Sequence, residues 1–211
     1  MKRLFLLVAV LAGSTMTFAQ EKGDMYIGAS LNFAAGSSTT ITTVSDISDS
    51  ETTPNSTSFG ISAEYGYFVA KNFRVALSLG YEFESQPTLK DGDSWSKSKA
   101  SLFCINPNVA YYVRLADRFY YTPEVGADFG FGSVNVPISR SSSMSQDISQ
   151  WGIYAHFLAL EFRATEHFAL GCSCGHLAYT SSKMKRDQAD LKVNTFKFDF
   201  GSCGVFARFY L

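Results

Sequence analysis

The chain has 211 residues, and its 18 basic and 19 acidic residues leave a formal net charge of −1. A charge so close to zero, with no stripe of basic residues, argues against nucleic acid as a partner. Aromatic residues make up 15% of the chain and 16 residues are glycine, a pairing that recurs in membrane β-barrels.

The first predicted element is an export signal. Two basic residues precede the apolar run "LFLLVAVLAG" (4–13), and "TFA" (17–19) supplies small residues at positions −3 and −1 of a cleavage site. The apolar run is shorter than the roughly 20 residues of a transmembrane helix. We therefore expect residues 1–19 to be a cleaved signal peptide and residues 20–211 to form one domain.

Alternation of apolar and polar residues dominates the rest of the chain. Odd positions 73–83 read Phe, Val, Leu, Leu, Tyr, Phe, whereas even positions 74–84 read Arg, Ala, Ser, Gly, Glu, Glu. Such alternation is typical of β-strands with one apolar face. Eight segments show it, over residues 24–36, 57–69, 72–85, 99–113, 118–132, 150–163, 167–179 and 194–211.

Short and long connections alternate between these segments. The three short ones each carry a small or hydroxyl residue, then charged or polar residues, then Phe, at 70–73, 116–119 and 165–168. We interpret each repeat as a tight turn between two antiparallel strands at the same end of one sheet. The four long polar connections are expected to be loops, over residues 37–56, 86–98, 133–149 and 180–193.

Two kinds of barrel fit this alternation, with opposite faces turned outward. A soluble lipocalin-like barrel would line a ligand cavity with apolar residues such as Leu77 and Leu79, whereas a membrane barrel turns them to lipid. The Gly- and Ser-rich polar face fits a narrow eight-stranded interior. Short turns at one end and long loops at the other are typical of outer-membrane barrels. Both features favour the membrane barrel.

Aromatic residues near the tight turns favour the same choice, because amphipathic rings gather at membrane interfaces. An open sheet edge in lipid would leave backbone groups unpaired, so the sheet must close. We therefore predict an all-β protein, an eight-stranded antiparallel up-and-down transmembrane β-barrel. The expected interfacial aromatic residues are Tyr65, Tyr67, Phe68, Phe73, Tyr111, Tyr112, Phe119, Tyr121, Phe162 and Phe168.

The signal peptide, "GYFVAKNFRVALSLGY" (66–81) and "PNVAYYVRLADRFYYTPEVGADFGFG" (107–132) resemble a known family. This is the small OmpA/OmpX-like outer membrane protein beta-barrel domain family of Bacteroidetes type, often labelled porin family. The resemblance spans essentially the whole mature chain. It implies a bacterial outer-membrane protein with both termini in the periplasm. Outer-membrane lipid, lipopolysaccharide and the barrel-assembly machinery are then the expected partners, and no cofactor is expected.

The C-terminal stretch "SCGVFARF" (202–209) resembles a barrel-assembly signal of this family. Ser202, Gly204, Ala207 and Phe209 occupy its positions. The chain departs from the pattern by ending in Tyr210-Leu211 rather than in a terminal Phe or Trp.

The polar face carries charges of both signs. Because an isolated charge in a narrow interior is costly, we expect them to pair with one another. The favoured interpretation is a salt-bridge network that fills the lumen, and the alternative is a narrow polar conduit or gate. The candidate residues are Glu64, Arg74, Glu82, Arg114, Glu124, Asp128, Lys197, Asp199 and Arg208.

The segment 150–163 changes parity part-way, because its apolar residues are odd-numbered up to Phe157 and even-numbered from Leu158. A β-bulge near 157–158 would reset the alternation. Glu161 and Arg163 would then face the lumen.

The four cysteines, at 104, 172, 174 and 203, show no zinc-ligand spacing, so no metal site is expected. Cys172 and Cys174 share one face of a strand. Cys203 is in position to oppose either of them. Free lipid-facing thiols are favoured, and a disulfide stays open.

No catalytic activity is expected, because His156, His167 and His176 form no convincing nucleophile–base set with a serine. The leading function is a structural or narrow porin-like barrel. One alternative is a surface adhesin or ligand-binding barrel that acts through loops 37–56 and 133–149, with the ligand unknown. Another is a soluble periplasmic lipocalin-like binder. Lys183, Lys185 and Arg186 are candidates for contact with lipopolysaccharide.

Overall fold

The computed structural model describes residues 21–44, 47–91, 94–139, 142–184 and 191–211. The predicted signal peptide, residues 1–19, lies outside the described residues. Within them, all ten strands belong to one sheet. They are β1 (Met25–Val44), β2 (Ile47–Ala70), β3 (Phe73–Asp91), β4 (Ser94–Tyr111), β5 (Val113–Ala116), β6 (Phe119–Tyr121), β7 (Glu124–Ser139), β8 (Ser142–Arg163), β9 (Phe168–Met184) and β10 (Leu191–Tyr210).

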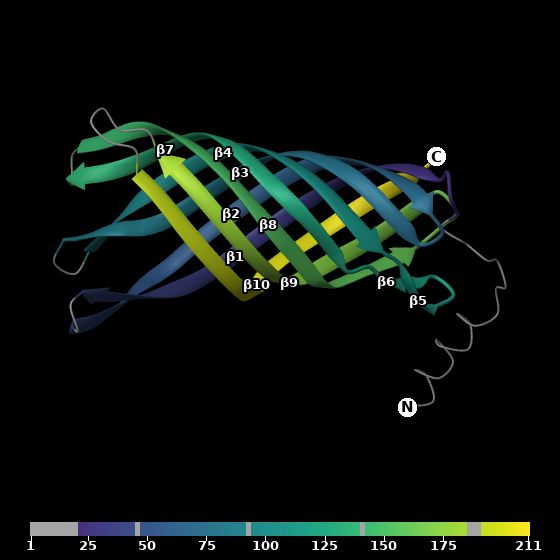
Figure 1. Ribbon diagram of the computed structural model, residues 1–211, viewed down its shortest axis with the longest axis horizontal. Coiled ribbons are helices and arrows are strands. Elements are labelled where there is room, and N and C mark those ends of the chain that lie inside the picture. The colour runs from purple at the N-terminus through teal and green to yellow at the C-terminus, as the bar shows by residue number, and fades with distance from the viewer. Residues whose placement is uncertain (1–20, 45–46, 92–93, 140–141, 185–190) are drawn as a thin grey trace.

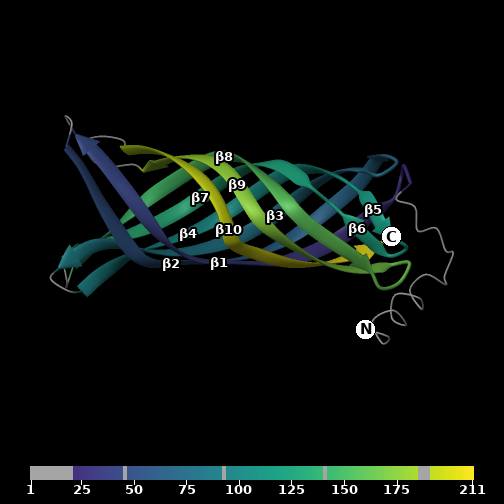
Figure 2. The same cartoon turned by 90° about the horizontal axis from the view of Figure 1, so that it is seen from below.

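Eight of these strands close into a barrel (Figures 1 and 2). Antiparallel pairing runs in the order β1, β2, β3, β4, β7, β8, β9, β10 and then returns to β1. The register of closure places Tyr26 of β1 opposite Tyr210 of β10 and opposite Gly66 of β2. The predicted eight-stranded antiparallel barrel is therefore confirmed.

The remaining two strands, β5 and β6, form a short hairpin that extends the barrel at its tight-turn end. β6 pairs with β8, so the hairpin continues the paths of β4 and β7. Thr122 and Pro123 separate β6 from β7. The strand breaks here because proline cannot donate a ladder hydrogen bond. The Thr122 amide nevertheless donates to the Ala159 carbonyl at 2.9 Å. The barrel wall thus has eight strands, and β5 and β6 are a short extension of it.

All three tight turns lie at one end of the barrel, together with both ends of the described chain (Figure 1). The Leu211 amide donates to the Met25 carbonyl at 3.0 Å, which joins these two ends directly. The first turn holds Asn72 at a φ of 62°. The three repeats of the sequence therefore mark one rim of the barrel.

The long connections differ from the prediction, because the strands continue into them as paired hairpins. β1 and β2 stay paired as far as Val44 and Ile47, with one register shift between Gly36 and Ser38, within the expected loop 37–56. The same occurs within 86–98, 133–149 and 180–193. Threonine is a good strand former, and hydroxyl residues opposite one another stabilise a sheet. The low-complexity sequence therefore forms paired strands here. The predicted loops are wrong in length, because most of each one is strand.

The two faces of the barrel have the polarity of a membrane protein. Leu77 and Leu79 project outward with 46% and 47% of their surface exposed. The polar residues between and beside them, such as Arg74 and Ser78, are buried inside. The lipocalin-like alternative is wrong, because its cavity would be lined by those leucines. In the described part of the chain, no helix is long and apolar enough to cross a membrane.

The expected β-bulge is present in β8. From Tyr121 to Glu124 the β6–β7 path takes three steps, whereas β8 takes four steps between the opposing residues, Leu160 and His156. The extra residue reverses the parity of β8. Leucine side chains beyond the bulge face outward, and two charged side chains are buried in the interior, Glu161 and Arg163.

Candidate functional site

A cluster of charged and tyrosine side chains fills the barrel near its tight-turn end. Three arginines face three glutamates, so the formal charges balance. A balanced cluster is how a narrow interior tolerates buried charge, since an unpaired one is strongly destabilising. We call this cluster the plug; it consists of Glu64, Glu124, Glu161, Arg74, Arg163, Arg208, Tyr26, Tyr112 and Tyr210.

Arg74 organises one half of the plug. Its Nη1 donates to the Tyr26 hydroxyl at 2.6 Å and to Glu64 Oε1 at 3.3 Å. Its Nη2 donates to Asn108 Oδ1 at 2.7 Å and to the Glu124 carboxylate. One fully buried guanidinium on β3 therefore binds side chains from four other strands.

Arg208 organises the other half. Its Nη1 donates to Glu161 Oε2 at 2.6 Å and to the Tyr112 hydroxyl at 3.2 Å. Its Nη2 lies 3.0 Å from Glu64 Oε1. Glu161 also accepts a hydrogen bond of 2.6 Å from the Tyr210 hydroxyl. Because Glu64 binds both arginines, the two halves form one network.

Aromatic rings close the plug. The Arg163 guanidinium carbon lies 3.7 Å from the centroid of the Tyr210 ring. The Phe68 ring centroid lies 5.1 Å from that of Tyr112 and 6.4 Å from that of Tyr210. None of these four side chains has more than 4% of its surface exposed. Packed rings and charge-balanced groups therefore fill the barrel interior at this level.

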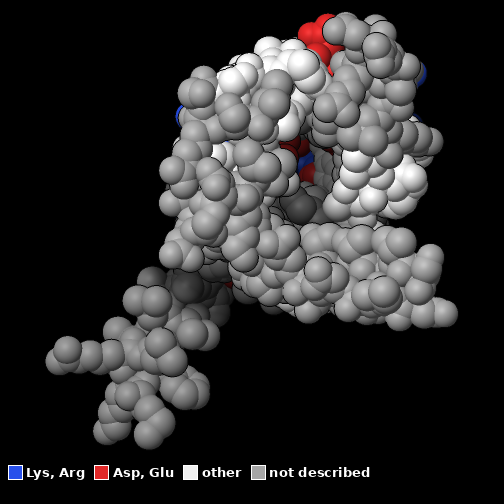
Figure 3. Space-filling model, turned by 90° about the vertical axis from the view of Figure 1, so that its left-hand side faces the viewer, with Lys and Arg blue, Asp and Glu red and all other residues white. Residues whose placement is uncertain are grey.

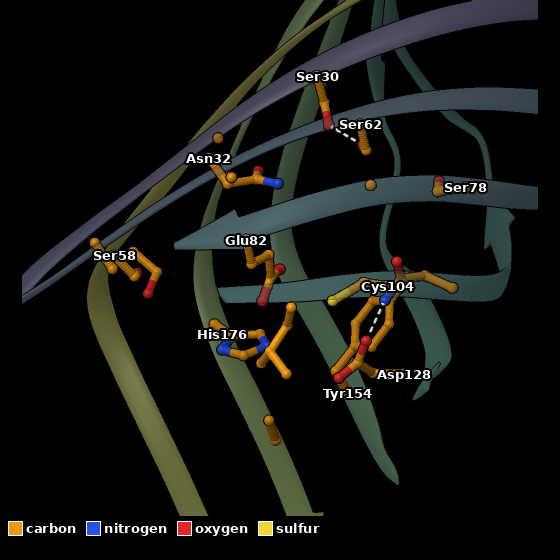
Figure 4. Close-up of a pocket in the computed structure, with 18 of the residues that line it drawn as sticks. Ser30, Asn32, Ser58, Ser62, Ser78, Glu82, Cys104, Asp128, Tyr154 and His176 are labelled. Atoms are coloured by element: carbon orange, nitrogen blue, oxygen red, sulfur yellow. Dashed lines mark hydrogen bonds between the residues drawn. The ribbon is translucent and has the colours of Figure 1, made fainter. Parts of the chain in front are cut away.

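The end of the barrel opposite the tight turns, where the long paired hairpins lie, is called the hairpin end. Towards it, the lumen widens into a cavity of about 460 Å³. Seen from that end, the barrel is hollow, and acidic and basic side chains are visible at the bottom of the hollow (Figure 3). We call this cavity the cup. Its polar lining includes Ser30, Ser62, Glu82, Asp128 and His176 (Figure 4).

Asp128, on the wall of the cup, is held by two amide side chains. Asp128 accepts hydrogen bonds from Asn106 Nδ2 at 2.6 Å and from Gln150 Nε2 at 2.9 Å. Asp128 thus differs from the plug glutamates Glu64, Glu124 and Glu161, each of which meets an arginine.

The histidine side chains are accounted for by packing. His156 and His176 lie side by side in the lumen with ring centroids 5.1 Å apart, and Tyr154 packs against both. His167 Nδ1 lies 3.1 Å from the Tyr210 carbonyl oxygen in the third turn. Within the described residues, no group of three or more His, Cys, Asp or Glu side chains is arranged to hold a metal ion.

Most of the predicted lumen charges do lie in the lumen, at two levels. Glu64, Arg74, Glu124 and Arg208 meet in the plug. Glu82 and Asp128 line the cup instead. The backbones of residues 197 and 199 lie on β10, opposite Ala178 and His176, but the side chains of Lys197 and Asp199 are outside the described part of the structure.

Arg114 does not belong to the lumen network. It lies on β5, whose four residues are all exposed, and its Nη2 donates to Asp117 Oδ1 in the same hairpin at 2.6 Å. The reason is axial position: β5 extends beyond the closed end of the lumen, where parity no longer separates inside from outside. The prediction for this residue is wrong.

The ten aromatic residues expected at the membrane interface divide into three groups, of which Tyr67, Tyr121 and Phe162 are half-buried. Tyr65, Phe73, Tyr111, Phe119 and Phe168 are exposed on the outer surface. Phe68 and Tyr112 are instead buried in the interior. Phe68 shares the parity of Glu64 and Gly66, which is the sequence signal for an inward position.

The plug tyrosines are the functional residues that the sequence does not single out. Tyr26 alternates with the outward residues Met25 and Ile27, so its parity alone places it inside. Nothing in the sequence distinguishes a tyrosine that binds a buried arginine from one that merely fills space.

The four residues of the expected assembly signal all lie on β10. Phe209 is outward, 49% exposed, and stacks on His167 with a centroid separation of 5.9 Å. Gly204 is buried between the side chains of Asn32 and Ser173. Ser202 and Ala207 occupy the same strand, opposite Ala34 and Ala29 of β1.

Comparison with known proteins gives one family. The sequence profile of the outer membrane protein beta-barrel domain matches residues 5–202. Similar solved structures are the N-terminal β-barrel domain of Pseudomonas aeruginosa OprF (12% identity, 91% of this chain and 100% of that chain, TM-score 0.44), and Pseudomonas aeruginosa OprG (14%, 92% and 98%, 0.47). A third is Ail, the attachment invasion locus protein of Yersinia pestis (12%, 90% and 99%, 0.42). No curated protein matches the chain.

Proposed function

Because this chain belongs to the outer membrane protein beta-barrel domain family, and is thus an integral protein of the bacterial outer membrane, we propose that it is a structural barrel with a closed lumen. The plug is the observation that carries this proposal. Arg74, Arg208 and Glu161 each have at most 5% of their surface exposed. On this proposal, charged groups so closely paired and so deeply buried block a continuous water path through the barrel.

We further propose the orientation and the partners. Outer-membrane barrels keep short turns on the periplasmic side, so the tight turns and both chain ends face the periplasm and the long hairpins face outside. The barrel-assembly machinery would recognise β10 through Ser202, Gly204, Ala207 and Phe209. Lys183, exposed on β9 at the hairpin end, would approach anionic lipopolysaccharide head groups; Lys185 and Arg186 lie outside the described residues.

Conductance in planar lipid bilayers tests the closed lumen. We expect the wild-type barrel to insert without steady channel openings. Arg208→Ser removes the guanidinium that joins Glu64 to Glu161, and the unpaired carboxylates should then admit water and cations. Stepwise, cation-selective conductance is the expected result.

Arg114→Ser is the matched control, because it removes an arginine from the exposed hairpin and leaves the plug intact. It should be as silent as the wild type. Insertion of each variant is checked by the change of gel mobility on boiling. Steady openings of the wild-type protein would support the narrow conduit instead and reject the closed barrel.

A second candidate function, surface adhesion, is favoured by the length of the strands. A transmembrane strand needs about 9–11 residues, whereas β2 has 24 and β8 has 22. The strands continue as long hairpins at the end opposite the tight turns (Figures 1 and 2), and we infer that this surplus lies outside the membrane. Hairpins carried on a barrel scaffold are suited to contact other surfaces.

Shortening the β1–β2 hairpin within 37–56 and the β7–β8 hairpin within 133–149 tests adhesion. Attachment of cells to mucin-coated plates should fall if these hairpins bind, and should persist when the β3–β4 hairpin is shortened within 86–98. Equal attachment in all strains would reject the adhesin.

We propose no catalytic activity. The histidine rings that a hydrolase would use as general bases are engaged by aromatic packing in the lumen and by a backbone carbonyl in the third turn. Incubation with esterase and peptidase substrates should give rates unchanged by His156→Ala, and a rate lost in that variant would contradict this.

A further inference from the structure

We propose that Cys174 and Cys203 are joined by a disulfide that fastens β9 to β10 in the exported protein. The two residues lie directly opposite each other in the ladder, and their Sγ atoms are 3.2 Å apart. Sulfur atoms in a disulfide are about 2.05 Å apart. A shift of roughly one ångström therefore converts this pair of free thiols into a bonded pair.

The geometry selects one pairing among the four cysteines. Cys172 lies opposite Val205 on one side and Leu160 on the other, so neither of its neighbours is a cysteine. Cys104 is buried on β4, between Gly80 and Gly130 of the adjacent strands. Neither of these cysteines has a thiol directly opposite it, whereas Cys174 and Cys203 face each other.

The pair lies where the β9–β10 ladder is interrupted. Pairing stops at Asp199 opposite His176 and resumes at Cys203 opposite Cys174. Three residues of β10 therefore face only Gly175 of β9, which has a φ of 75°. β10 also bends sharply part-way along its length (Figures 1 and 2).

A covalent bond at this point would hold the two strands together where the ladder hydrogen bonds are missing. The ladder resumes on both sides of the break, so a bond here would hold the register of β9 and β10 across it. The disulfide is the one covalent link within reach, and it fixes the two strands at the first pair beyond the break.

The oxidation balances with a disulfide-bearing oxidant of the periplasm, a compartment in which disulfides form and persist. One cysteine thiolate attacks the disulfide of a thiol–disulfide oxidoreductase and forms a mixed disulfide. The second thiolate attacks that cysteine's sulfur and releases the oxidoreductase as a dithiol. Two electrons and two protons thus pass from Cys174 and Cys203 to the oxidant. The bond forms before insertion, because a thiolate is unfavourable in hydrocarbon, and the barrel that then closes is the one that places the two bonded cysteines opposite each other.

Counting free thiols in the outer-membrane protein tests the pairing. Cells are quenched with acid, and the fraction that shifts mobility on boiling is denatured and labelled with maleimide-polyethylene glycol, before or after reduction. With four cysteines in the chain, the wild type should carry two labels without reduction and four after it. A water-soluble phosphine should fail to reduce the bond in intact membranes and should reduce it once the barrel is denatured.

The cysteine variants identify the partners. Cys174→Ser and Cys203→Ser should each carry three labels with or without reduction, because either change frees the other thiol. Cys172→Ser is the matched control, a neighbour on the same strand, and should carry one label without reduction and three after it. Four labels on the unreduced wild type would overturn the proposal, and so would loss of the bond in Cys172→Ser.

Discussion

Arg208 Nη1 lies 2.6 Å from Glu161 Oε2, although β10 and β8 are not neighbours in the barrel. β9 runs between them, and it presents Ala169 opposite Arg208 and Gly171 opposite Glu161. A Cβ built on Gly171 would lie 2.1 Å from the Phe206 ring. Small residues on β9 therefore leave the space in which side chains of β8 and β10 form an ion pair.

Replacing Glu161 by Gln should destabilise the barrel strongly. The change keeps the shape of the side chain but leaves the buried Arg208 without this counter-charge. Breaking a buried ion pair costs about 3–5 kcal/mol. Urea unfolding in detergent, followed by the loss of the fast-migrating band on unboiled gels, should show a midpoint at clearly lower urea.

Asp117→Asn is the control for that loss. The ion pair of Asp117 with Arg114 is partly exposed, at 30% and 42% of the side-chain surfaces, and such pairs contribute about 0–1 kcal/mol. Its midpoint should stay close to that of the wild type. Equal shifts in the two variants would show that the plug pairing contributes no special stability.

The sequence predicts the strands and their faces because alternation is a local property. Each of the eight predicted segments overlaps a strand of the barrel wall. The change of parity near Phe157 also correctly predicts a bulge. The long hairpins are not legible, because serine and threonine runs suit both loops and strands. The sequence also does not predict how far along the barrel axis a residue lies. Arg114 and Glu64 share the polar parity, but their positions along the axis differ, so Arg114 is exposed to solvent and Glu64 lies in the plug. The partners in the plug depend on contacts across the lumen, which no local pattern encodes.

Replacing Gly66 by Ala should disturb the plug through Tyr26. A Cβ at Gly66 would lie 2.0 Å from Cε1 of Tyr26, and the hydroxyl of that tyrosine binds Arg74 and Glu64. Overpacking of this kind costs about 1–3 kcal/mol. The urea midpoint should fall accordingly.

Gly60→Ala, on the same strand, is the control for Gly66→Ala. Its nearest contact would be 3.3 Å, to Cγ of the flexible Glu82 side chain, so the neighbour yields at little cost. Similar losses at Gly60 and Gly66 would mean that the strand, and not the approach of Tyr26, sets the penalty.

A charge on the outer face should be harmful according to its depth. Leu79 is outward in the middle of β3, opposite Ala63 and Ile105. An arginine on the lipid face near the membrane midplane costs about 2–4 kcal/mol, and close to an interface about 0–1 kcal/mol. Leu79→Arg should therefore reduce the amount of heat-modifiable protein in the outer membrane. Leu115→Arg, on the short β5–β6 hairpin at the tight-turn end, should leave the amount of heat-modifiable protein nearly unchanged.

The first tight turn should discriminate between substitutions at Asn72. This residue has a φ of 62°, and its carbonyl accepts a hydrogen bond of 2.8 Å from the Tyr112 amide. The left-handed conformation costs L-residues roughly 1–2 kcal/mol, from which glycine is exempt and asparagine partly so. Asn72→Val should therefore lower the urea midpoint.

Asn72→Gly keeps access to the same backbone conformation and separates conformation from the loss of the side chain. Its midpoint should remain near the wild-type value, because glycine adopts positive φ without steric strain. If the glycine variant were as unstable as the valine variant, the asparagine side chain would be the stabilising element. The first repeat would then owe its turn to a side-chain contact and not to its backbone geometry.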